Sequence, residues 1–473
     1  MKRFLWLSWM AFLFLICAGC GDTFRPIIIP NPPTFPDPKA AHTVIAVNDN
    51  GPISDGSVLV VDVSGDSEVG IGNVGIAPVH AVQQGASQVL VLNQATTSTS
   101  TASLSKVFFF GTVINGTIGT ISLPPNSAPN FVAVAPSDTT AYVTLPNYVP
   151  DPTNFPDVVV PSVGVVSTTT NALVATIQVG NCPMEIAVTP DKSKLYVANN
   201  SPFCNPLTPG GSMSAFNTLD RSARPITGTL SSPPVWLSPR ADSQRVYVLE
   251  ANGTLAWLDT TVTAGPDTLT ESSISVPGAT VMVYDGHLNR LYIPGGSEVA
   301  VVDVSQSVPQ IIGNNGNPLP ISTFPRENRG PQDVCYGLHT DTPPAVTAGA
   351  AAALPDGSRA YVGAYYEDAA GNICSQVTVI NTSNNSVKAV IGVPGFPNYD
   401  ATCATTRFRF TMAAGGDSSR VYLASCDGGG VNDIDTSTDS FLVNLPAPFS
   451  NRAPIPPSQF APPQNPVFLI PGP

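Results

Sequence analysis

The sequence predicts an all-β protein built from one repeated four-stranded unit, and three observations lead to this prediction. A short phrase, clearest in "IAVTPDKSKLYVANN" (186–200), returns along most of the chain. The composition favours strands and turns, with 39 Gly, 49 Pro and only 11% charged residues. Short apolar runs separated by polar turns recur in sets of four, about one set per 50 residues, which is typical of a β-propeller.

Each copy of the repeat has an apolar strand, a polar turn, and a second strand that usually contains a tyrosine followed by an aliphatic residue. These tyrosines are Tyr142, Tyr196, Tyr247, Tyr292, Tyr361 and Tyr422. A third strand ending in Asp or Asn follows, as in "TLAWLDTT" (254–261), and then a fourth, such as "NALVATIQVG" (171–180). One such meander cannot bury both of its faces alone, so the units are expected to stack around a ring.

The number of blades follows from the two ends of the repeat region. Seven complete units run over 77–124, 128–180, 182–231, 233–277, 279–323, 335–395 and 403–447. An incomplete unit, "HTVIAVND" with "SVLVVDVS", has a second and a third strand but no first strand, and the C-terminal segment Asn465–Pro471 supplies one. We therefore predict eight blades in a ring closed by strands from both termini, which removes an exposed edge. Seven blades with the partial unit outside the ring is the alternative.

The phrase "KLYVANN" and its relatives resemble the YVTN-type β-propeller repeat of bacterial and archaeal surface proteins, over most of residues 42–447. The resemblance implies a propeller fold, mostly seven-bladed in that family. Members act as surface-layer, adhesion or ligand-binding domains, and the wider superfamily contains propeller lactonases. The motif is specific for architecture and names no ligand.

The first residues are predicted to be a signal peptide. Lys2 and Arg3 precede an apolar run of 13 residues, Phe4–Ile16, which is short for a bilayer span of about 20 residues. The following "ICAGC" resembles the lipobox of bacterial lipoproteins, which implies cleavage before Cys20 and lipidation of its thiol. An ordinary secretory signal is the alternative.

The sequence then divides into three segments. Residues 1–19 are the signal peptide, residues 20–41 are the lipidated cysteine with a proline-rich tether, and residues 42–473 are the propeller domain. Cys17 departs from the lipobox pattern, which usually has Leu there. By the family's sorting rule, Gly21 in place of Asp favours the outer membrane over the inner one, with the protein outside the cytoplasm.

Six cysteines remain in the exported part, and an even number there indicates disulfides. Within the repeat, three of them precede a first strand and three follow the second strand of the same unit. These two positions lie at the same end of an antiparallel pair, so we predict three bonds on one face: Cys182–Cys204, Cys335–Cys374 and Cys403–Cys426. A redox or metal site is the alternative, and it lacks a CxxC pair or a histidine at ligand spacing.

Patterns for catalysis are absent from the sequence. The net charge of -13 without a Lys/Arg cluster argues against nucleic acid as a partner. His42, His80, His287 and His339 lie far apart and form no HExxH motif, and there is no G-x-S-x-G or Walker sequence. No catalytic residue, cofactor or metal is predicted.

Two long segments interrupt the repeat, at 322–344 and 364–374. Both are expected on the disulfide-bonded side, joined by Cys335–Cys374, and long loops on a rigid scaffold often carry function. Because Arg and Tyr dominate contact energy at interfaces, we predict a binding site there. Its candidate residues are Arg326, Arg329, Asp333, His339, Tyr366, Glu367 and Asp368.

The sequence thus favours a binding or scaffolding module, anchored to the membrane by its N-terminal lipid, with an envelope protein or a glycan as partner. A propeller hydrolase of the lactonase type is one alternative, and it needs a metal or a general base in the central pore. A structural surface-layer component is another. An enzyme is the less favoured reading.

Overall fold

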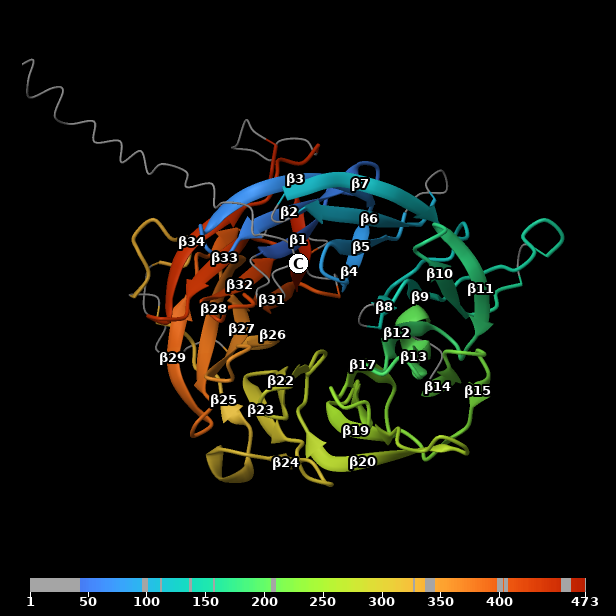
Figure 1. Cartoon of the computed structure of the whole chain (residues 1–473). Coiled ribbons are helices and arrows are strands. Elements are labelled where there is room, and N and C mark those ends of the chain that lie inside the picture. Colours follow the sequence, from blue (N-terminus) through green and yellow to red (C-terminus); the bar gives the residue numbers. More distant parts are fainter. Residues whose placement is uncertain are drawn as a thin grey trace, which may run out of the picture. The chain divides into compact units, whose positions relative to one another are not determined.

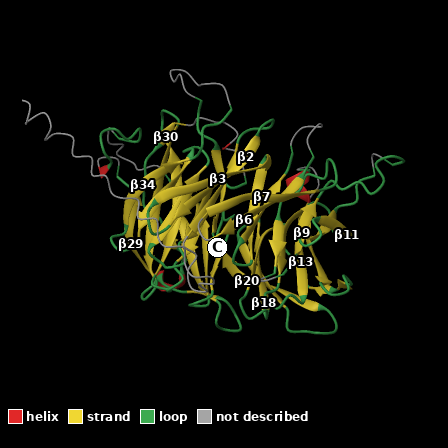
Figure 2. Ribbon diagram, turned by 45° about the horizontal axis from the view of Figure 1, so that its top comes forward, coloured by secondary structure: helices red, strands yellow, loops and turns green. Residues whose placement is uncertain are grey.

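The computed structural model describes residues 43–95, 101–110, 113–135, 138–155, 158–205, 210–325, 328–336, 345–397, 403, 407–451 and 461–472. These residues form eight β-sheets arranged in a ring around a central axis (Figure 1). Figure 2 shows strands throughout, and the helical segments with described bounds are α2 (Ser201–Cys204) and the 3-10 turn η1 (Asn314–Gly316). The predicted eight-bladed propeller is confirmed. The predicted signal peptide and tether lie outside the described residues.

The first four blades run from the N-terminus. Blade 1 contains β1 (Thr43–Asp49), β2 (Asp55–Asp62), β3 (Ser67–Ile76) and β35 (Asn465–Pro471). Blade 2 contains β4 (Pro78–Gln84), β5 (Gln88–Asn93), β6 (Ser103–Phe110) and β7 (Val113–Ser122). Blade 3 contains β8 (Val132–Val134), β9 (Thr140–Leu145), β10 (Ser162–Ser167) and β11 (Ala172–Gln178). Blade 4 contains β12 (Pro183–Val188), β13 (Lys194–Asn200), β14 (Gly211–Asn217) and β15 (Ala223–Arg224).

The remaining blades follow the same inner-to-outer order. Blade 5 contains β17 (Pro234–Pro239), β18 (Arg245–Glu250), β19 (Thr254–Asp259) and β20 (Asp267–Ser275), with β16 (Ile226–Thr227) outside it. Blade 6 contains β21 (Val283–Asp285), β22 (Arg290–Gly295), β23 (Glu298–Asp303), β24 (Gln310–Ile311) and β25 (Leu319–Pro320). Blade 7 contains β26 (Thr347–Ala353), β27 (Arg359–Glu367), β28 (Asn372–Asn381), β29 (Ser386–Gly392) and β30 (Phe396–Pro397). Blade 8 contains β31 (Phe410–Ala414), β32 (Arg420–Ser425), β33 (Gly430–Asp435) and β34 (Ser440–Pro446).

The two ends of the chain close the ring within blade 1. Strand β35 is the innermost strand of that blade and pairs antiparallel with β1, placing Ile470 opposite Ile45. The Ser57 hydroxyl donates to Gln464 Oε1 at 2.7 Å, which adds a contact between the two ends. The seven-bladed alternative is therefore wrong, because the partial unit completes a blade of its own.

Blade 4 departs from the regular pattern at its outer edge. Its fourth strand, β15, pairs with β14 through only two residues, after which β16 runs parallel to β20 of blade 5. Pro225 lies between β15 and β16 and has no N–H to donate, so it cannot continue the antiparallel ladder. The outer edge of blade 4 is consequently shorter than the edges of its neighbours.

The strand order gives the ring two distinct faces. The turns between first and second strands and between third and fourth strands lie at one face, which we call the clamp face. The connections between second and third strands, and from one blade to the next, lie at the other face. We call this second face the disulfide face, because all three disulfides lie there.

The repeated basic residue and tyrosine of blades 4 to 8 join each of these blades to the next across the clamp face. In blade 4, Lys194 Nζ donates to the carbonyl oxygens of Thr260 (2.6 Å) and Val262 (2.7 Å), and to Asp267 Oδ1 (2.8 Å), all in blade 5. The Tyr196 hydroxyl donates to Asp267 Oδ2 at 2.8 Å. In this contact, a cation two residues before the tyrosine reaches the turn between the third and fourth strands of the next blade. We call it the inter-blade clamp.

The clamp recurs around the ring. Arg290 Nη1 donates to Thr382 O (2.7 Å) and Asn385 Oδ1 (2.8 Å), and Arg420 forms a forked pair with Asp66 at 2.7 and 2.9 Å. Arg359 pairs with Asp439 at 2.8 Å, and Arg245 reaches Gln306 O at 3.3 Å. At the boundary from blade 2 to blade 3 the cation is instead Lys106, from a third strand, bonded to Thr168 O and Asn171 Oδ1. A cation from the preceding blade thus satisfies most of the receiving turns.

A buried carboxyl group lies beside the clamp that closes the ring. Asp433 in β33 is fully buried, and neither of its carboxylate oxygens accepts a hydrogen bond from a described donor. Arg420 Nε is 3.8 Å from Asp433 Oδ1. Burial and the neighbouring Asp66 carboxyl raise the pKa of Asp433 to about 8.

Replacing Lys194 by Met removes one of the two cations that neutralise the buried Asp267, and we expect it to lower the free energy of unfolding by about 3 kcal/mol. The matched control is Lys388→Met, because Lys388 pairs with Asp439 at 2.6 Å but is 39% exposed. An exposed pair contributes at most about 1 kcal/mol. Urea denaturation of both variants makes the comparison, and equal losses would contradict the clamp's role.

Because the folded-state pKa of Asp433 lies above its ordinary value of 3.8, the folded protein holds a proton that the unfolded chain releases. This group therefore lowers stability as pH rises from about 4 to about 8. We expect Asp433→Asn to gain stability relative to the wild type over this range in urea denaturation.

Asp435→Asn is the control for this pH dependence. Burial opposes ionisation of Asp435, but hydrogen bonds from Ser437 and Thr438 prevail and hold its pKa below the ordinary value. Its difference from the wild type should therefore stay flat over the same range. A flat difference for Asp433→Asn would contradict the raised pKa.

Candidate functional site

The three disulfides join the cysteines that the repeat pattern pairs: Cys182–Cys204, Cys335–Cys374 and Cys403–Cys426. Their Cα–Cα distances are 5.8, 5.8 and 5.7 Å, within the range of unstrained bonds. They close loops at the disulfide face in blades 4, 7 and 8. Disulfides of this kind indicate a protein that folds outside the cytoplasm.

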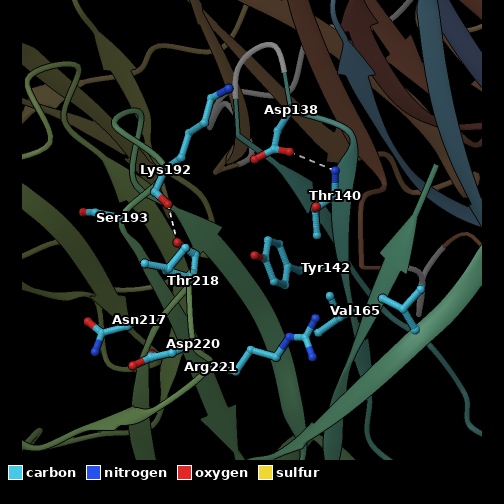
Figure 3. Close-up of a pocket in the computed structure, with 12 residues that line it drawn as sticks. Asp138, Thr140, Tyr142, Val165, Lys192, Ser193, Asn217, Thr218, Asp220 and Arg221 are labelled. Carbon is cyan, nitrogen blue, oxygen red and sulfur yellow. Dashed lines mark hydrogen bonds between the residues drawn. The ribbon is translucent and has the colours of Figure 1, made fainter. Parts of the chain in front are cut away.

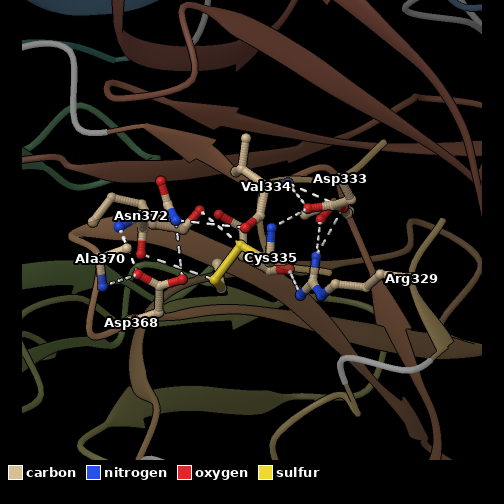
Figure 4. Close-up of a disulfide and its surroundings, with 12 residues drawn as sticks. Arg329, Asp333, Val334, Cys335, Asp368, Ala370 and Asn372 are labelled. Carbon is tan, nitrogen blue, oxygen red and sulfur yellow. Dashed lines mark hydrogen bonds and ion pairs between the residues drawn. A yellow bond between two sulfur atoms is a disulfide. The ribbon is translucent and has the colours of Figure 1, made fainter. Parts of the chain in front are cut away.

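The predicted binding residues are grouped around Cys335–Cys374, but several of them face inward (Figure 4). Arg329 is only 5% exposed, and its guanidinium donates to Val393 O (2.5 Å) and Ser375 O (2.8 Å). It also forms an ion pair with Asp333 at 3.4 Å and lies 5.4 Å from the Phe324 ring centroid. Arg329 therefore braces the long connection between blades 6 and 7.

The two aspartates of the predicted site organise turns. Asp333 Oδ1 accepts hydrogen bonds from the backbone N–H groups of Cys335 (2.8 Å) and Gly395 (3.2 Å). Gly395 has no room for a side chain, since a Cβ there would meet Cys335 Sγ at 2.1 Å. Asp368 Oδ1 accepts from the N–H groups of Ala370 (2.8 Å) and Asn372 (2.9 Å), which shapes the turn between β27 and β28.

The other predicted residues differ in exposure. Tyr366 is 3% exposed and its hydroxyl has no partner among the described residues, whereas Glu367 is exposed. Arg326 and His339 lie outside the described residues. The structure thus brings Arg329, Asp333 and the disulfide together as an internal brace, with Glu367 at the surface.

Exposed aromatic side chains mark the disulfide face, and the sequence analysis did not identify them. The structure describes four aromatic residues among its strongly exposed large hydrophobic side chains: Phe155 (60%), Phe203 (47%), Tyr336 (48%) and Phe449 (74%). All four lie on connections at this face, and Phe203 and Tyr336 adjoin disulfide cysteines. In the sequence, each of these residues is an aromatic residue within a polar connection. That pattern does not reveal whether the side chain is exposed or buried.

Aromatic side chains from several blades meet near the axis of the ring. The His80 and Phe131 ring centroids are 3.7 Å apart, and those of His80 and Phe468 are 4.3 Å apart. Phe408 lies 5.0 Å from Phe468 and 5.9 Å from Trp236. Because these residues come from blades 1, 2, 3 and 5 and from the start of blade 8, their contact fills the channel.

One buried ion pair lies within this aromatic cluster. Arg407 Nη2 contacts Glu185 Oε2 at 2.7 Å, and the guanidinium carbon lies 4.9 Å from the Phe408 centroid and 5.3 Å from the Phe131 centroid. Glu185 Oε1 accepts the Leu237 N–H at 3.0 Å. Burial raises the pKa of Glu185, while Arg407 and this N–H oppose the rise.

The histidine near the axis of the ring is packed against its neighbours. His80 is 4% exposed, and burial beside Arg407 lowers its pKa. His287 lies in the first turn of blade 6, and His42 and His339 are outside the described residues. Within the described residues, no set of three or more His, Cys, Asp and Glu side chains is placed to hold a metal ion.

The described helices include none that is long and apolar enough to cross a bilayer.

Comparisons with known proteins support the fold. No family model and no curated protein matches this chain. Among solved structures, apo AztD from Citrobacter koseri superposes with a TM-score of 0.54 at 10% identity, over 90% of this chain and 96% of AztD. Dihydro-heme d1 dehydrogenase NirN, in complex with DHE, gives 0.53 at 10% identity, over 88% of this chain and 76% of NirN. At these identities the likeness shows a shared β-propeller and no more.

The ion pair in the channel can be tested by a double-mutant cycle. Replacing Arg407 by Met leaves Glu185 buried without its cation, and we expect a loss of about 3–5 kcal/mol in unfolding free energy. Adding Glu185→Gln should recover much of that loss, because the uncompensated charge is then gone. Additive losses in urea denaturation would show that the two side chains do not act as a pair.

Proposed function

We propose that this chain is an extracytoplasmic, lipid-anchored binding or scaffolding module whose disulfide face takes a protein of the cell envelope. One observation carries the proposal: the four strongly exposed aromatic residues of the described chain all lie on that face. Aromatic residues are enriched at protein interfaces, where they contribute large contact area.

The disulfides support binding by holding this face in shape. Cys204 directly follows Phe203, and Cys335 directly precedes Tyr336. Both aromatic residues are therefore fixed close to a covalent link, which reduces the conformational entropy lost when a partner binds. Arg329 and Asp333 add a noncovalent brace to the same connection.

The polar residues predicted from the sequence would contribute less to binding than the aromatic residues. Glu367 and Asp368 would form a polar rim beside the aromatic residues, as is usual around an apolar interface core. Arg326 and His339, outside the described residues, stay candidates from the sequence. Arg329, Asp333 and Tyr366 would act by supporting the loops. The exposed aromatic residues lead us to propose a protein partner, with a glycan as the alternative.

The lipid anchor rests on the sequence "ICAGC" with Cys20 as the lipidated residue. An extracytoplasmic site, by that family's rule at the outer membrane, agrees with the three disulfides. Replacing Cys20 by Ser should release the protein from the membrane fraction. The hydrolase alternative needs a reactive group open to solvent in the channel, where Glu185 and His80 are buried.

The test is a crosslinking pull-down of the tagged protein from native envelopes. A Phe203→Ser/Tyr336→Ser variant should lose a specific protein that the wild type captures. The matched control, Val387→Ser/Leu442→Ser, removes two exposed apolar residues from outer strands and should keep that protein.

Equal capture by all three forms would contradict binding through the disulfide face. Recovery of envelope polysaccharide without a protein would favour the glycan alternative. Crosslinks only between copies of the chain itself would favour the structural surface-layer alternative.

A further inference from the structure

The inter-blade clamp is interrupted at the boundary between blades 3 and 4. Tyr142 in β9 occupies the position of Tyr196 and the other repeat tyrosines, but the residue two places before it is Thr140. The equivalent residue in blades 4 to 8 is Lys or Arg. Blade 3 therefore supplies no cation at this position to the turn it faces.

The receiving turn in blade 4 is altered as well. The acceptor residue lies four places after the last residue of the third strand, and it is Asp66, Asn171, Asn385 or Asp439 in other blades. All four have positive φ angles between 47° and 53°, which Asn and Asp tolerate well. In blade 4 this position holds Arg221, also with a positive φ of 60°.

The Arg221 guanidinium forms no ion pair with a carboxylate of the described residues, although Asp138 and Asp220 also line the same pocket. It forms no hydrogen bond or ion pair within this part of the chain, and its side chain is exposed. The nearby carboxylates are occupied with their own turns. Asp138 accepts the N–H groups of Thr139 (2.6 Å) and Thr140 (3.0 Å), and Asp220 accepts from Ser222 N (3.0 Å) and Oγ (2.7 Å).

A pocket of about 730 Å³ occupies the space where the clamp is missing (Figure 3). Figure 3 shows the Tyr142 ring between Thr140 and the extended Arg221 side chain. The short fourth strand of blade 4 lies nearby and leaves this part of the rim open. The lining residues are Asp138, Thr140, Tyr142, Val165, Val174, Lys192, Ser193, Asn217, Thr218, Leu219, Asp220 and Arg221.

The groups around the pocket suit an anionic oxygen pair beside a small apolar body. A guanidinium presents parallel N–H donors to a carboxylate, and such forked pairs are stronger than neutral hydrogen bonds. Burial raises the pKa of Tyr142, so its hydroxyl stays protonated and is available as a donor. Val174 and Leu219, 49% and 97% exposed, are apolar residues at the rim of the pocket that a ligand could cover.

We propose that the pocket between blades 3 and 4 binds a small organic carboxylate, with Arg221 and Tyr142 contacting the carboxylate and Val165, Val174 and Leu219 contacting its apolar part. This site opens near the clamp face and is independent of the proposed protein-binding surface on the disulfide face. In blades 1, 3, 7 and 8 an Asp or Asn side chain of the receiving turn accepts from the cation of the preceding blade, and here the ligand's carboxylate would accept from Arg221 of the receiving turn.

The probes are para-fluorobenzoate, its neutral analogue para-fluorobenzamide and the cationic para-fluorobenzylamine, followed by fluorine NMR line broadening with the full chain. The benzoate should bind and the other two should bind at least about tenfold more weakly, since charge-assisted hydrogen bonds are lost. Arg221→Gln should weaken benzoate binding by a similar factor. Lys388→Gln removes a cation at another boundary and should leave it unchanged.

A second variant rebuilds the clamp. Thr140→Arg with Arg221→Asp reproduces the Arg359–Asp439 pair, so it should fill the pocket, abolish benzoate binding and raise the thermal midpoint. Preference for the amide or the amine, unchanged binding in Arg221→Gln, or binding retained in the rebuilt variant would each overturn the proposal. Should the rebuilt variant not fold, the Arg221→Gln and Lys388→Gln comparison still decides it.

Discussion

The inter-blade clamp is the interaction on which the ring depends. Several turns between third and fourth strands present carbonyl oxygens to which Lys194 and its counterparts donate from the preceding blade. The partner carboxylate Asp267 is buried, and both of its cations come from the neighbouring blade. The repeat therefore encodes contact between neighbours as well as the blade itself, and Arg420 with Asp66 extends this contact across the closure.

The remaining features divide between the two faces and the axis. At the axis, the aromatic cluster around Arg407 and Glu185 fills the channel with packed, engaged groups. The disulfide face carries exposed aromatic residues on braced connections, and this is the surface that we propose for a protein partner. On the clamp face, cations of the preceding blade satisfy most of the described turns, and where Thr140 and Arg221 replace the usual pair a pocket lies between blades 3 and 4. A change in one contact of the repeat thus coincides with the pocket that we propose as a ligand site.

The candidate binding site shows why residue type predicts a site less well than it predicts a fold. Arginine is common at interfaces, which predicts Arg329 as a contact residue, yet its guanidinium bonds to Val393 and Ser375 inside the connection. Asp333 and Asp368 are charged loop residues, and both accept backbone N–H groups. A long irregular loop needs such internal partners to satisfy its own backbone, so its polar residues need not face solvent.

The sequence by itself determined the eight blades, the closing strand at Asn465–Pro471 and the three disulfides, because each follows from a repeat read along the chain with near-neighbour contacts. Only the tertiary structure decided that Phe131, Phe408 and Phe468 meet at the axis, since that contact requires the ring to close. It also decided that Thr140 faces the turn of Arg221. Neither residue is unusual alone, and the missing ion pair exists only where two blades meet.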